Sequence, residues 1–506
     1  MIISSRLKPF LVFVVSGLWL ALFQSWGKFS DPDGFYHAKM ALLVAERGPI
    51  QSFPWLNLTT LGQHFADQHF LYHVALIPFV KLFGGLWGTQ IAAVFFSALF
   101  VTVFYLVLRA LRAPAPWIWT ALLLVLPHVL FRLTWAKATP LALVCFALGM
   151  MCLIRRKPWL AFGIGVIYSL MHGGWVLLIG CQVLFLFGKW VTEHMAFDER
   201  FTRRSFRDAL PLLATMFGIG VGLLLHPNAS AELSFLWTQV IQVGVATPYG
   251  HVIMGNEWYP PQIDDLIQML ALPMIALTVV GFGLLVARRE PLDRKQAVLG
   301  TALLVAASGP FALLLKSIRF LEYVLPLLVL AIAALADLVD WNVFVQRVRE
   351  LLPKLATPVL IVALLAFTVR MDVNAWHAIH DSGLVFGRFN AALSWLDSQA
   401  QSGDRIYESN WDVFPELFYG IDRVHFVSGL DPTFLYKQNP ELSDGYLKLT
   451  QGDATSTAYH VIRDLAGASF VFLDRRASAK LEGVIRTDSR FEEGYSDESA
   501  YIFRVR

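Results

Sequence analysis

The sequence predicts a polytopic α-helical membrane protein with a C-terminal extracytoplasmic α/β domain. The first observation is composition: the chain has 506 residues, of which 56% are hydrophobic and only 16% charged, whereas soluble domains are about one quarter charged. The second is a change near residue 372, where long apolar windows give way to short β-like runs. The net charge of +3, without any basic run, argues against a nucleic-acid partner.

Apolar windows of the length that crosses a bilayer, roughly 17–25 residues each, fill the first part of the chain. About eleven are expected, near residues 9–27, 90–108, 115–131, 139–154, 158–171, 173–189, 209–226, 266–287, 297–315, 320–338 and 355–370. The fifth and sixth nearly touch at His172-Gly173-Gly174, which predicts a very tight turn.

The distribution of basic residues predicts the orientation. Lysines and arginines gather in alternate connections, and none occurs in residues 227–265. Because basic residues are enriched on the cytoplasmic side, we expect a cytoplasmic N-terminus, with residues 28–89, 227–265 and the C-terminus outside. The expected location is the bacterial inner membrane.

Two domains are expected, a transmembrane domain at residues 1–371 and a soluble α/β domain at residues 372–506. Within the first, residues 70–83 are short for a span and are interrupted by Lys81, so they predict an interfacial helix. Within the second, β-like and helical segments are mixed. The β-like runs are residues 469–473 and 500–505, and the helical stretch is residues 387–400.

An acidic and aromatic cluster follows the first window. Asp31 and Asp33 belong to an Asp-Pro-Asp-Gly-Phe-Tyr-His segment that ends at Tyr36 and His37. Carboxylates at a membrane boundary cost solvation energy unless they bind a cation, a proton or a charged substrate. Such acids can ligate a hard divalent cation or act as a general base. Capping of a helix that begins near Gly34 explains one acid, but not both together with Tyr-His.

Further histidines stand at the start of the expected interfacial helix. The cluster consists of His64, Asp67, His69 and His73. The i, i+4 spacing of His69 and His73 would suit a transition metal such as zinc. A polar patch that contacts the substrate and a polar helix start in the headgroup region are the alternatives.

A second acidic and aromatic cluster lies in the long loop after the seventh window. Glu257 is followed by Trp258, Tyr259 and two prolines, and its loop offers no basic partner. That arrangement favours a polar ligand, with a plain surface turn as the alternative.

Lys316 and Arg319 open the tenth window, where an anionic phosphate or a salt bridge to Glu322 would balance their charge. The same interpretation, a phosphate or an ion-pair partner, applies to Arg132 and Lys137. These two residues flank the connection between the third and fourth windows.

The order of these clusters resembles the GT-C superfamily of membrane glycosyltransferases, and within it the catalytic subunit of oligosaccharyltransferases. The segments that resemble family motifs are Asp31–His37, His172–Trp175, Asn256–Pro261, Ile318–Phe320 and Asn410–Asp412. Asp31 matches the family's first-loop acid if Asp-Pro is aligned, and Asp33 matches if Tyr-His is aligned. The segment Asn410-Trp411-Asp412 resembles a degenerate form of the family's Trp-Trp-Asp motif for acceptor recognition.

The resemblance implies a GT-C-like membrane domain that moves a sugar or oligosaccharide from a polyprenyl-phosphate-linked donor to an acceptor outside. Asp31 or Asp33 would activate the acceptor, and Glu257 would orient donor or acceptor. Arg319, with a metal or Lys137, would stabilise the leaving phosphate. The implied substrate-binding residues are Tyr36, His37, His64, Asp67, His69, Lys137, Trp258, Tyr259, Lys316, Arg319, Trp411 and Asp412. Membrane lipid is the remaining expected partner.

Two departures leave alternatives open. The family's pair of acids between the third and fourth spans is replaced here by residues 135–140, which contain Lys137 and no acid. Two alternatives for the mechanism therefore stay open. Either Mg²⁺ or Mn²⁺ is bound by Asp31, Asp33 and Glu257, or the mechanism uses no metal. The acceptor motif is incomplete, so glycan, lipid and protein acceptors all stay open.

The competing interpretations are a lipid or sugar transporter or flippase and a non-catalytic assembly factor. A transporter predicts ionisable residues near the middle of its spans, whereas the windows here are nearly free of charge at their centres. An assembly factor would tolerate replacement of Asp33 and Glu257.

Overall fold

The computed structural model describes residues 6–197, 203–238, 252–453 and 457–506. Contacts group the chain into two units. The first unit contains residues 1–25, 93–223 and 256–382, and the second contains residues 26–92, 224–255 and 383–506. This grouping does not follow the expected boundary at residue 372, which stays a prediction.

The described residues contain seven helical segments that are long and apolar enough to cross a membrane. They are α5 (Gly85–Ala110), α10 (Trp175–Phe197), α11 (Arg203–Leu225), α13 (Ile263–Val286), α14 (Arg294–Leu314), α15 (Leu321–Ala336) together with the 3-10 turn η4 (Ile318–Phe320), and α17 (Ala356–Asp381). An eighth span is possible if the pair α6 (Pro116–Leu124) and α7 (Pro127–Leu133), bent by 74°, counts as one. Shorter apolar helices are α1 (Leu7–Phe23), α4 (Phe70–Phe83), α8 (Thr139–Ile154) and α9 (Pro158–Met171).

The polytopic helical fold is therefore confirmed, and each of the eleven expected windows coincides with an apolar helix or with the bent pair. Within the described residues, however, seven or eight of these are long enough to cross a membrane, and the windows at α1, α8 and α9 became shorter apolar helices. Proline explains the bend in that pair. Pro127 is the first residue of α7 and has no N–H to donate, and Leu126 before it is extended. Residues 70–83, expected as a short helix, form α4 with these bounds.

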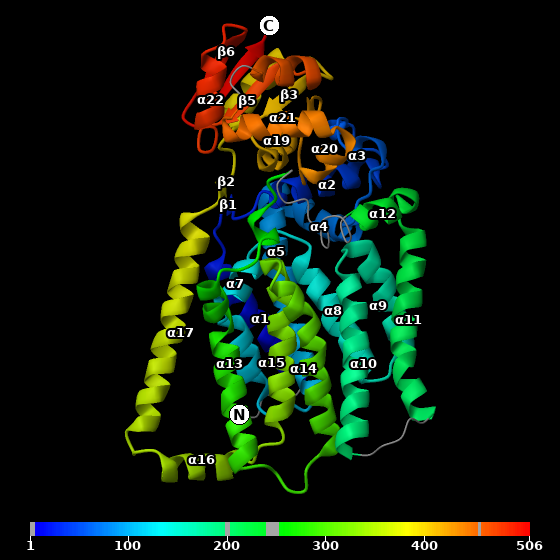
Figure 1. The fold of residues 1–506 in the computed structure, drawn as a ribbon, viewed down its shortest axis with the longest axis vertical. Coiled ribbons are helices and arrows are strands. Elements are labelled where there is room, and N and C mark those ends of the chain that lie inside the picture. Colours follow the sequence, from blue (N-terminus) through cyan, green and yellow to red (C-terminus); the bar gives the residue numbers. More distant parts are fainter. Residues whose placement is uncertain (1–5, 198–202, 239–251, 454–456) are drawn as a thin grey trace. The chain divides into compact units, whose positions relative to one another are not determined.

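Close helix packing forms the centre of the first unit. Figure 1 shows α14 with α10 and α15 beside it, and both pairs are in extensive contact. Gly188 of α10 allows this approach, because a Cβ there would lie 2.7 Å from Cβ of Val305 on α14. The amphipathic helix α16 (Trp341–Leu351) connects α15 to α17.

The tight turn expected between two windows is present at residues 172–174. α9 ends at Met171, and α10 begins at Trp175. The Gly174 N–H donates to Nδ1 of His172 over 2.8 Å. A Cβ on Gly174 would lie 2.5 Å from the hydroxyl of Tyr323, so only glycine fits this position.

The second unit contains a mixed five-stranded sheet with the order β4-β3-β5-β7-β6. β3 pairs in parallel with β4 and β5, whereas β7 is antiparallel to β5 and β6. The strands are β3 (Arg405–Glu408), β4 (His425–Phe426), β5 (Phe470–Asp474), β6 (Phe491–Ser496) and β7 (Ala500–Val505). The C-terminal α/β prediction is thus confirmed, and β5, β7 and α18 (Asn390–Gln399) coincide with the runs that the sequence singled out.

Helices complete the second unit. They are α2 (Asp33–Arg47), α3 (Thr60–Gln63), α12 (Ala229–Leu236), α19 (Phe414–Gly420), α20 (Thr433–Gln438), α21 (Pro440–Gln451) and α22 (Ala479–Arg486), with short turns η1 (Pro54–Leu56), η5 (Trp411–Val413) and η6 (His460–Leu465). A two-residue ribbon, β1 (Lys28–Phe29) with β2 (Leu384–Val385), pairs the segment after α1 with the segment after α17.

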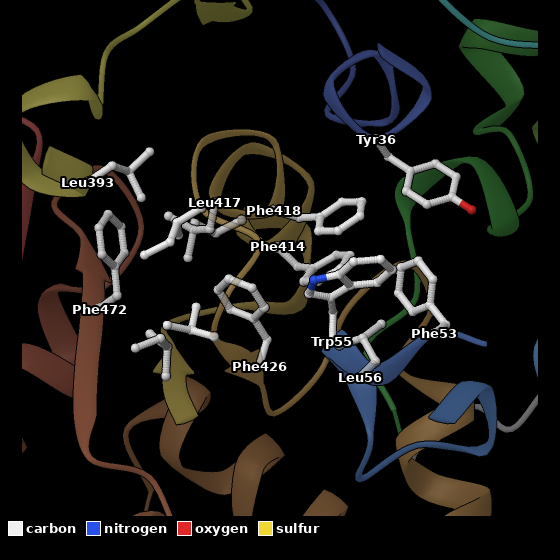
Figure 2. Close-up of a cluster of buried hydrophobic side chains, with 14 of the residues drawn as sticks. Tyr36, Phe53, Trp55, Leu56, Leu393, Phe414, Leu417, Phe418, Phe426 and Phe472 are labelled. Carbon is white, nitrogen blue, oxygen red and sulfur yellow. The ribbon is translucent and has the colours of Figure 1, made fainter. Parts of the chain in front are cut away.

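One hydrophobic core joins residues that are far apart in the sequence of this unit. Figure 2 shows Tyr36, Phe53 and Trp55 gathered against Phe414 and Phe418 of α19. The rings of Phe53 and Phe418 are 5.5 Å apart, and the Trp55 indole donates to the backbone oxygen of Asp422 over 2.6 Å. Burial of such large rings is the main stabilising contribution of this core, at roughly 25 cal/mol per Å² of apolar surface.

Candidate functional site

Three cationic side chains of the first unit converge on the carboxylate of Glu257. Nη1 of Arg132 lies 2.7 Å from Oε2, and Nζ of Lys137 lies 3.7 Å from the same oxygen. Nη2 of Arg319 lies 3.7 Å from Oε1. The loop of Glu257 contains no Lys or Arg of its own, so its partners come from the last turn of α7, from the connection after α7 and from η4.

Arg132 also binds a second carboxylate. Its Nε and Nη2 donate to Oε2 of Glu322, in the first turn of α15, over 3.1 and 2.9 Å. The ring of Trp135 lies beneath two cations, 4.3 Å from the Arg132 guanidinium and 4.7 Å from Nζ of Lys137. Arg132, Lys137 and Arg319 therefore face the carboxylates of Glu257 and Glu322.

The backbone around Glu257 is held against the start of η4. Oγ of Ser317 donates to the backbone oxygen of Glu257 over 2.7 Å, and the Ile318 N–H donates to the oxygen of Tyr259 over 3.0 Å. The guanidinium of Arg319 lies over the ring of Trp258 at 4.1 Å. These contacts fix the position of Arg319, which is partly exposed at 27%. Lys316, half-buried, stands in the same connection after α14.

The cations determine the ionisation of Glu257. Burial alone would raise the pKa of this carboxyl, but Lys137, Arg319 and Arg132 together hold the pKa well below its usual value. His172, in the turn between α9 and α10, has a pKa lowered to about 3 by burial and by Arg319. Its Nδ1 accepts the Gly174 N–H, which agrees with a neutral ring. At neutral pH the cluster therefore carries fixed charges.

The surroundings of Glu257 do not fit a metal ligand, because three cations already face its oxygens and would repel a divalent ion. Within the described ranges, no three His, Cys, Asp or Glu side chains are grouped as metal ligands would be. A metal bound by Asp31 and Asp33 stays a prediction.

Asp31 and Asp33 lie in the second unit, at the start of α2. Oδ1 of Asp31 accepts the Asp33 N–H over 2.9 Å, and the helix begins at Asp33 itself, one residue before the expected Gly34. Both carboxylates are half-buried. Asp33 in the first turn is favoured by the helix dipole, so local structure explains part of each acid's presence. Their predicted catalytic role is not decided by this geometry.

Three side chains from α2, α4 and the segment before α4 form a buried hydrogen-bonded chain in the second unit. Oδ2 of Asp67 lies 2.8 Å from Nδ1 of His73, and Nε2 of His73 lies 2.8 Å from Nδ1 of His37. A carboxylate only accepts, so Nδ1 of His73 donates to Asp67, and with a neutral His73 ring its Nε2 accepts from Nδ1 of His37. The contact between the two rings leaves no room for a zinc ion between them. His69 joins through its N–H, which donates to Oδ1 of Asp67.

Two residues near this chain were missed by the sequence reasoning. Nε2 of His226 donates to the backbone oxygen of Asp67 over 3.0 Å, because its Nδ1 accepts the Asn228 N–H. Glu232 lies 4.0 Å from His226 and is fully buried, and burial followed by the charge of Asp67 raises its pKa to about 7. The available signal was an acidic residue in a loop, residues 227–265, that contains no Lys or Arg.

The remaining predicted residues of the second unit are spread along it. Tyr36 is buried in the aromatic core. His64 is exposed at the end of α3. Trp411 donates its indole N–H to the backbone oxygen of Ile253 over 3.0 Å, and the neighbouring Asp412 has a pKa raised by burial and by Asp474. Part of the predicted loop 227–265, residues 239–251, lies outside the described residues.

Comparison of the sequence with protein-family models and with curated proteins finds no match. The fold, however, is similar to solved structures. One is the archaeal oligosaccharyltransferase AglB from Archaeoglobus fulgidus, in complex with an inhibitory peptide and a dolichol-phosphate. Its TM-score is 0.63 at 12% identity, and the match covers 99% of this chain and 74% of AglB.

Two further structures are similar over the same length. ArnT from Cupriavidus metallidurans, bound to undecaprenyl phosphate, matches with a TM-score of 0.57 at 12% identity, covering 99% of this chain and 98% of ArnT. The arabinofuranosyltransferase AftD from Mycobacteria matches with a TM-score of 0.56 at 15% identity, covering 99% of this chain and 42% of AftD. Over its whole length, this chain has the fold of the GT-C glycosyltransferases.

Proposed function

We propose that the protein is a membrane glycosyltransferase that takes a sugar from a polyprenyl-phosphate-linked donor. The observation that carries the proposal is the convergence of Arg132, Lys137 and Arg319 on Glu257. Polyprenyl phosphates are bound in the similar structures of AglB and ArnT.

In this proposal, Arg319 and Lys137 bind the donor phosphate. Arg319 is the more exposed of the two, and its planar guanidinium can donate two parallel hydrogen bonds to phosphate oxygens. Arg132 is buried between Glu257 and Glu322, so it holds the cluster together rather than reaching the substrate. Glu257 attracts all three cationic groups and so holds them in a fixed arrangement. Such a fixed arrangement can stabilise a developing charge without reorganisation.

The reaction replaces one bond at the anomeric carbon. The bond from this carbon to the phosphate oxygen breaks, and the phosphate leaves with the electron pair. A bond from the acceptor's nucleophilic atom to the same carbon forms, and the acceptor's proton passes to the carboxylate of Asp31 or Asp33. Arg319 and Lys137 stabilise the charge that develops on the phosphate.

A direct test is binding of undecaprenyl phosphate to the purified full-length protein in nanodiscs, measured by native mass spectrometry. Arg319→Ala and Lys137→Ala should weaken binding, because each removes a cation. Arg347→Ala is the matched control, since Arg347 is 60% exposed and forms an exposed ion pair with its helix neighbour Glu350. Equal binding by all four proteins would contradict the phosphate assignment.

Transfer itself is tested in cells that lack the gene. Lipid-linked sugar should accumulate, and a surface glycan or other conjugate should disappear, with rescue by the wild type. Asp33→Asn and Asp31→Asn should both be expressed in the membrane, and the variant that rescues poorly identifies the acid that acts as the base. Full rescue by both carboxylate variants would favour the assembly factor.

A further inference from the structure

The second unit contains a hollow of about 300 Å³ where the first turn of α5 meets α18 and α19. Six side chains that line it carry the argument: Phe35, Trp87, Phe386, Asn390, Glu416 and Tyr419. Leu393, labelled in Figure 2, also lines it. Pockets for small molecules range from about 300 to 1,000 Å³, so this volume suits a ligand of the size of one monosaccharide.

One wall of the hollow is aromatic. The rings of Trp87 and Phe386 lie 5.7 Å apart at 86°, and those of Phe35 and Phe386 lie 6.0 Å apart at 77°. Trp26 stacks on Trp87 at 6.4 Å, which restricts the indole, yet Trp87 stays 49% exposed. A fixed and accessible aromatic ring can pack against the C–H face of a sugar.

The polar part of the lining is a buried carboxylate, that of Glu416. Glu416 accepts from Nε of Arg388 over 2.9–3.0 Å, and the same guanidinium binds Asp474 over 2.9 Å. Arg388 thus binds both carboxylates, and a carboxylate can accept about four hydrogen bonds. Glu416 can therefore accept a further hydrogen bond from a ligand hydroxyl.

Hydrogen-bond donors come from the start of α5. The N–H groups in the first turn of a helix have no acceptor within it, and residues 84–87 line the hollow. Gly85 lets Tyr419 approach this turn, because a Cβ there would lie 2.4 Å from the tyrosine hydroxyl. An anion would be repelled by Glu416, and a cation by the positive end of the helix. A neutral polyhydroxylated ring can pair with both.

We propose that this hollow binds a single neutral sugar ring. Its C–H face packs on Trp87, its hydroxyls donate to Glu416, and its oxygens accept from the first turn of α5 and from the amide of Asn390. The proposal rests on the lining of the hollow and does not depend on the transfer reaction. The ring can belong to a soluble glycan or to a lipid-linked sugar.

Saturation-transfer NMR and tryptophan fluorescence on the full-length protein in detergent micelles test the soluble source. The probes are the methyl glycosides of glucose, mannose, galactose and N-acetylglucosamine. Trp87→Ala removes the stacking surface, and Asn390→Trp fills the hollow from an exposed position. Each should weaken binding at least tenfold. Trp159→Ala is the control, because Trp159 is 86% exposed and does not line the hollow.

Farnesyl-phosphate-linked sugar, compared with farnesyl phosphate, tests the lipid-linked source. Binding that requires the sugar and is lost in Trp87→Ala and Asn390→Trp supports the proposal, whether the sugar is soluble or lipid-linked. Sugar binding that neither variant weakens, or its absence in both forms, overturns it. Binding of farnesyl phosphate alone with the same sensitivity also overturns it. Arg319→Ala should leave soluble-sugar binding unchanged, which separates this result from a failure of phosphate binding.

Discussion

Arg132 binds two carboxylates at once, with Nη1 2.7 Å from Oε2 of Glu257 and Nη2 2.9 Å from Oε2 of Glu322. Its side chain is only 6% exposed. Because the guanidinium is buried, water could not take over its contacts with the two carboxylates if the side chain were removed. Arg132 therefore connects the loop that carries Glu257 to the first turn of α15 through two charge-assisted bonds.

Arg132→Ala should destabilise the protein strongly. The substitution leaves Glu322 buried without its guanidinium partner, and breaking a buried pair from one side costs about 3–5 kcal/mol. Thermal unfolding in detergent, followed by fluorescence, measures the effect. Arg347→Ala should change the free energy of unfolding by less than about 1 kcal/mol, because its ion pair is exposed. Equal midpoints for the two variants would contradict a structural role of Arg132.

Arg319 should matter for transfer more than for folding. Its side chain is partly exposed, and its contact with Glu257 is 3.7 Å, longer than that of Arg132. If it stabilises the leaving phosphate, Arg319→Ala should lower kcat by about 10²–10³-fold, the loss expected for one donor to a developing charge. Arg319→Lys keeps the charge and loses the bidentate geometry, so it should retain part of the activity. Rates are compared with synthetic polyprenyl-phosphate sugars.

The pH dependence of stability should show no transition from Glu257 near neutrality. Its pKa is held well below its usual value, so the folded state favours the ionised form. Its contribution is fully present above the unfolded pKa, about 4.3, and is lost as the pH falls toward the lower folded pKa. Unfolding midpoints from pH 8 down to 3 should therefore fall less steeply below pH 4 in Glu257→Gln than in the wild type.

The effect of Glu232 on the pH dependence of stability should be opposite to that of Glu257. Its pKa is raised to about 7, so folding favours the protonated form. Stability is greatest below the unfolded pKa and falls as the pH rises to about 7, by about 1.4 kcal/mol per unit at most. Glu232→Gln mimics the protonated form and should flatten this dependence, with a higher midpoint than the wild type at pH 8. A decline of the same size in the variant would contradict the assignment.

Local sequence patterns predicted the elements of this fold better than their partners. The apolar windows and the runs at residues 469–473 and 500–505 depend on hydrophobicity over a few residues, and each coincides with a helix or strand of the structure. The i, i+4 spacing of His69 and His73 suggested zinc, but a third ring, His37, from another helix bonds directly to His73. No local pattern contains that contact.

The charged cluster shows the same limit. Glu257 was singled out because its loop has no basic residue, which correctly marks a carboxylate that needs a distant partner. Glu322 was considered as a partner for Lys316 or Arg319, whereas the structure pairs it with Arg132, 190 residues away. The choice among several nearby cations depends on how α7 and α15 pack, and that information is not local.

The chain of Asp67, His73 and His37 gives the last prediction. All three side chains are buried, and the two hydrogen bonds of 2.8 Å join α2, which begins at Asp33, to α4. Removing the central ring takes one hydrogen bond from the buried Asp67 carboxylate and one from the buried His37 ring, at about 1–3 kcal/mol each. His73→Leu should therefore lower the unfolding midpoint clearly, while His377→Leu, an exposed histidine of α17, should not.

The same variant distinguishes a positioning role from a purely structural one. If the chain positions the start of α2 and Asp33 is the base, His73→Gln should retain part of the hydrogen bonding and fold better than His73→Leu. Its transfer rate should still fall, with little change in the affinity for undecaprenyl phosphate, because the cationic cluster belongs to other residues. A His73→Gln protein with normal transfer and a lowered midpoint would show that the chain stabilises α2 without positioning the acid.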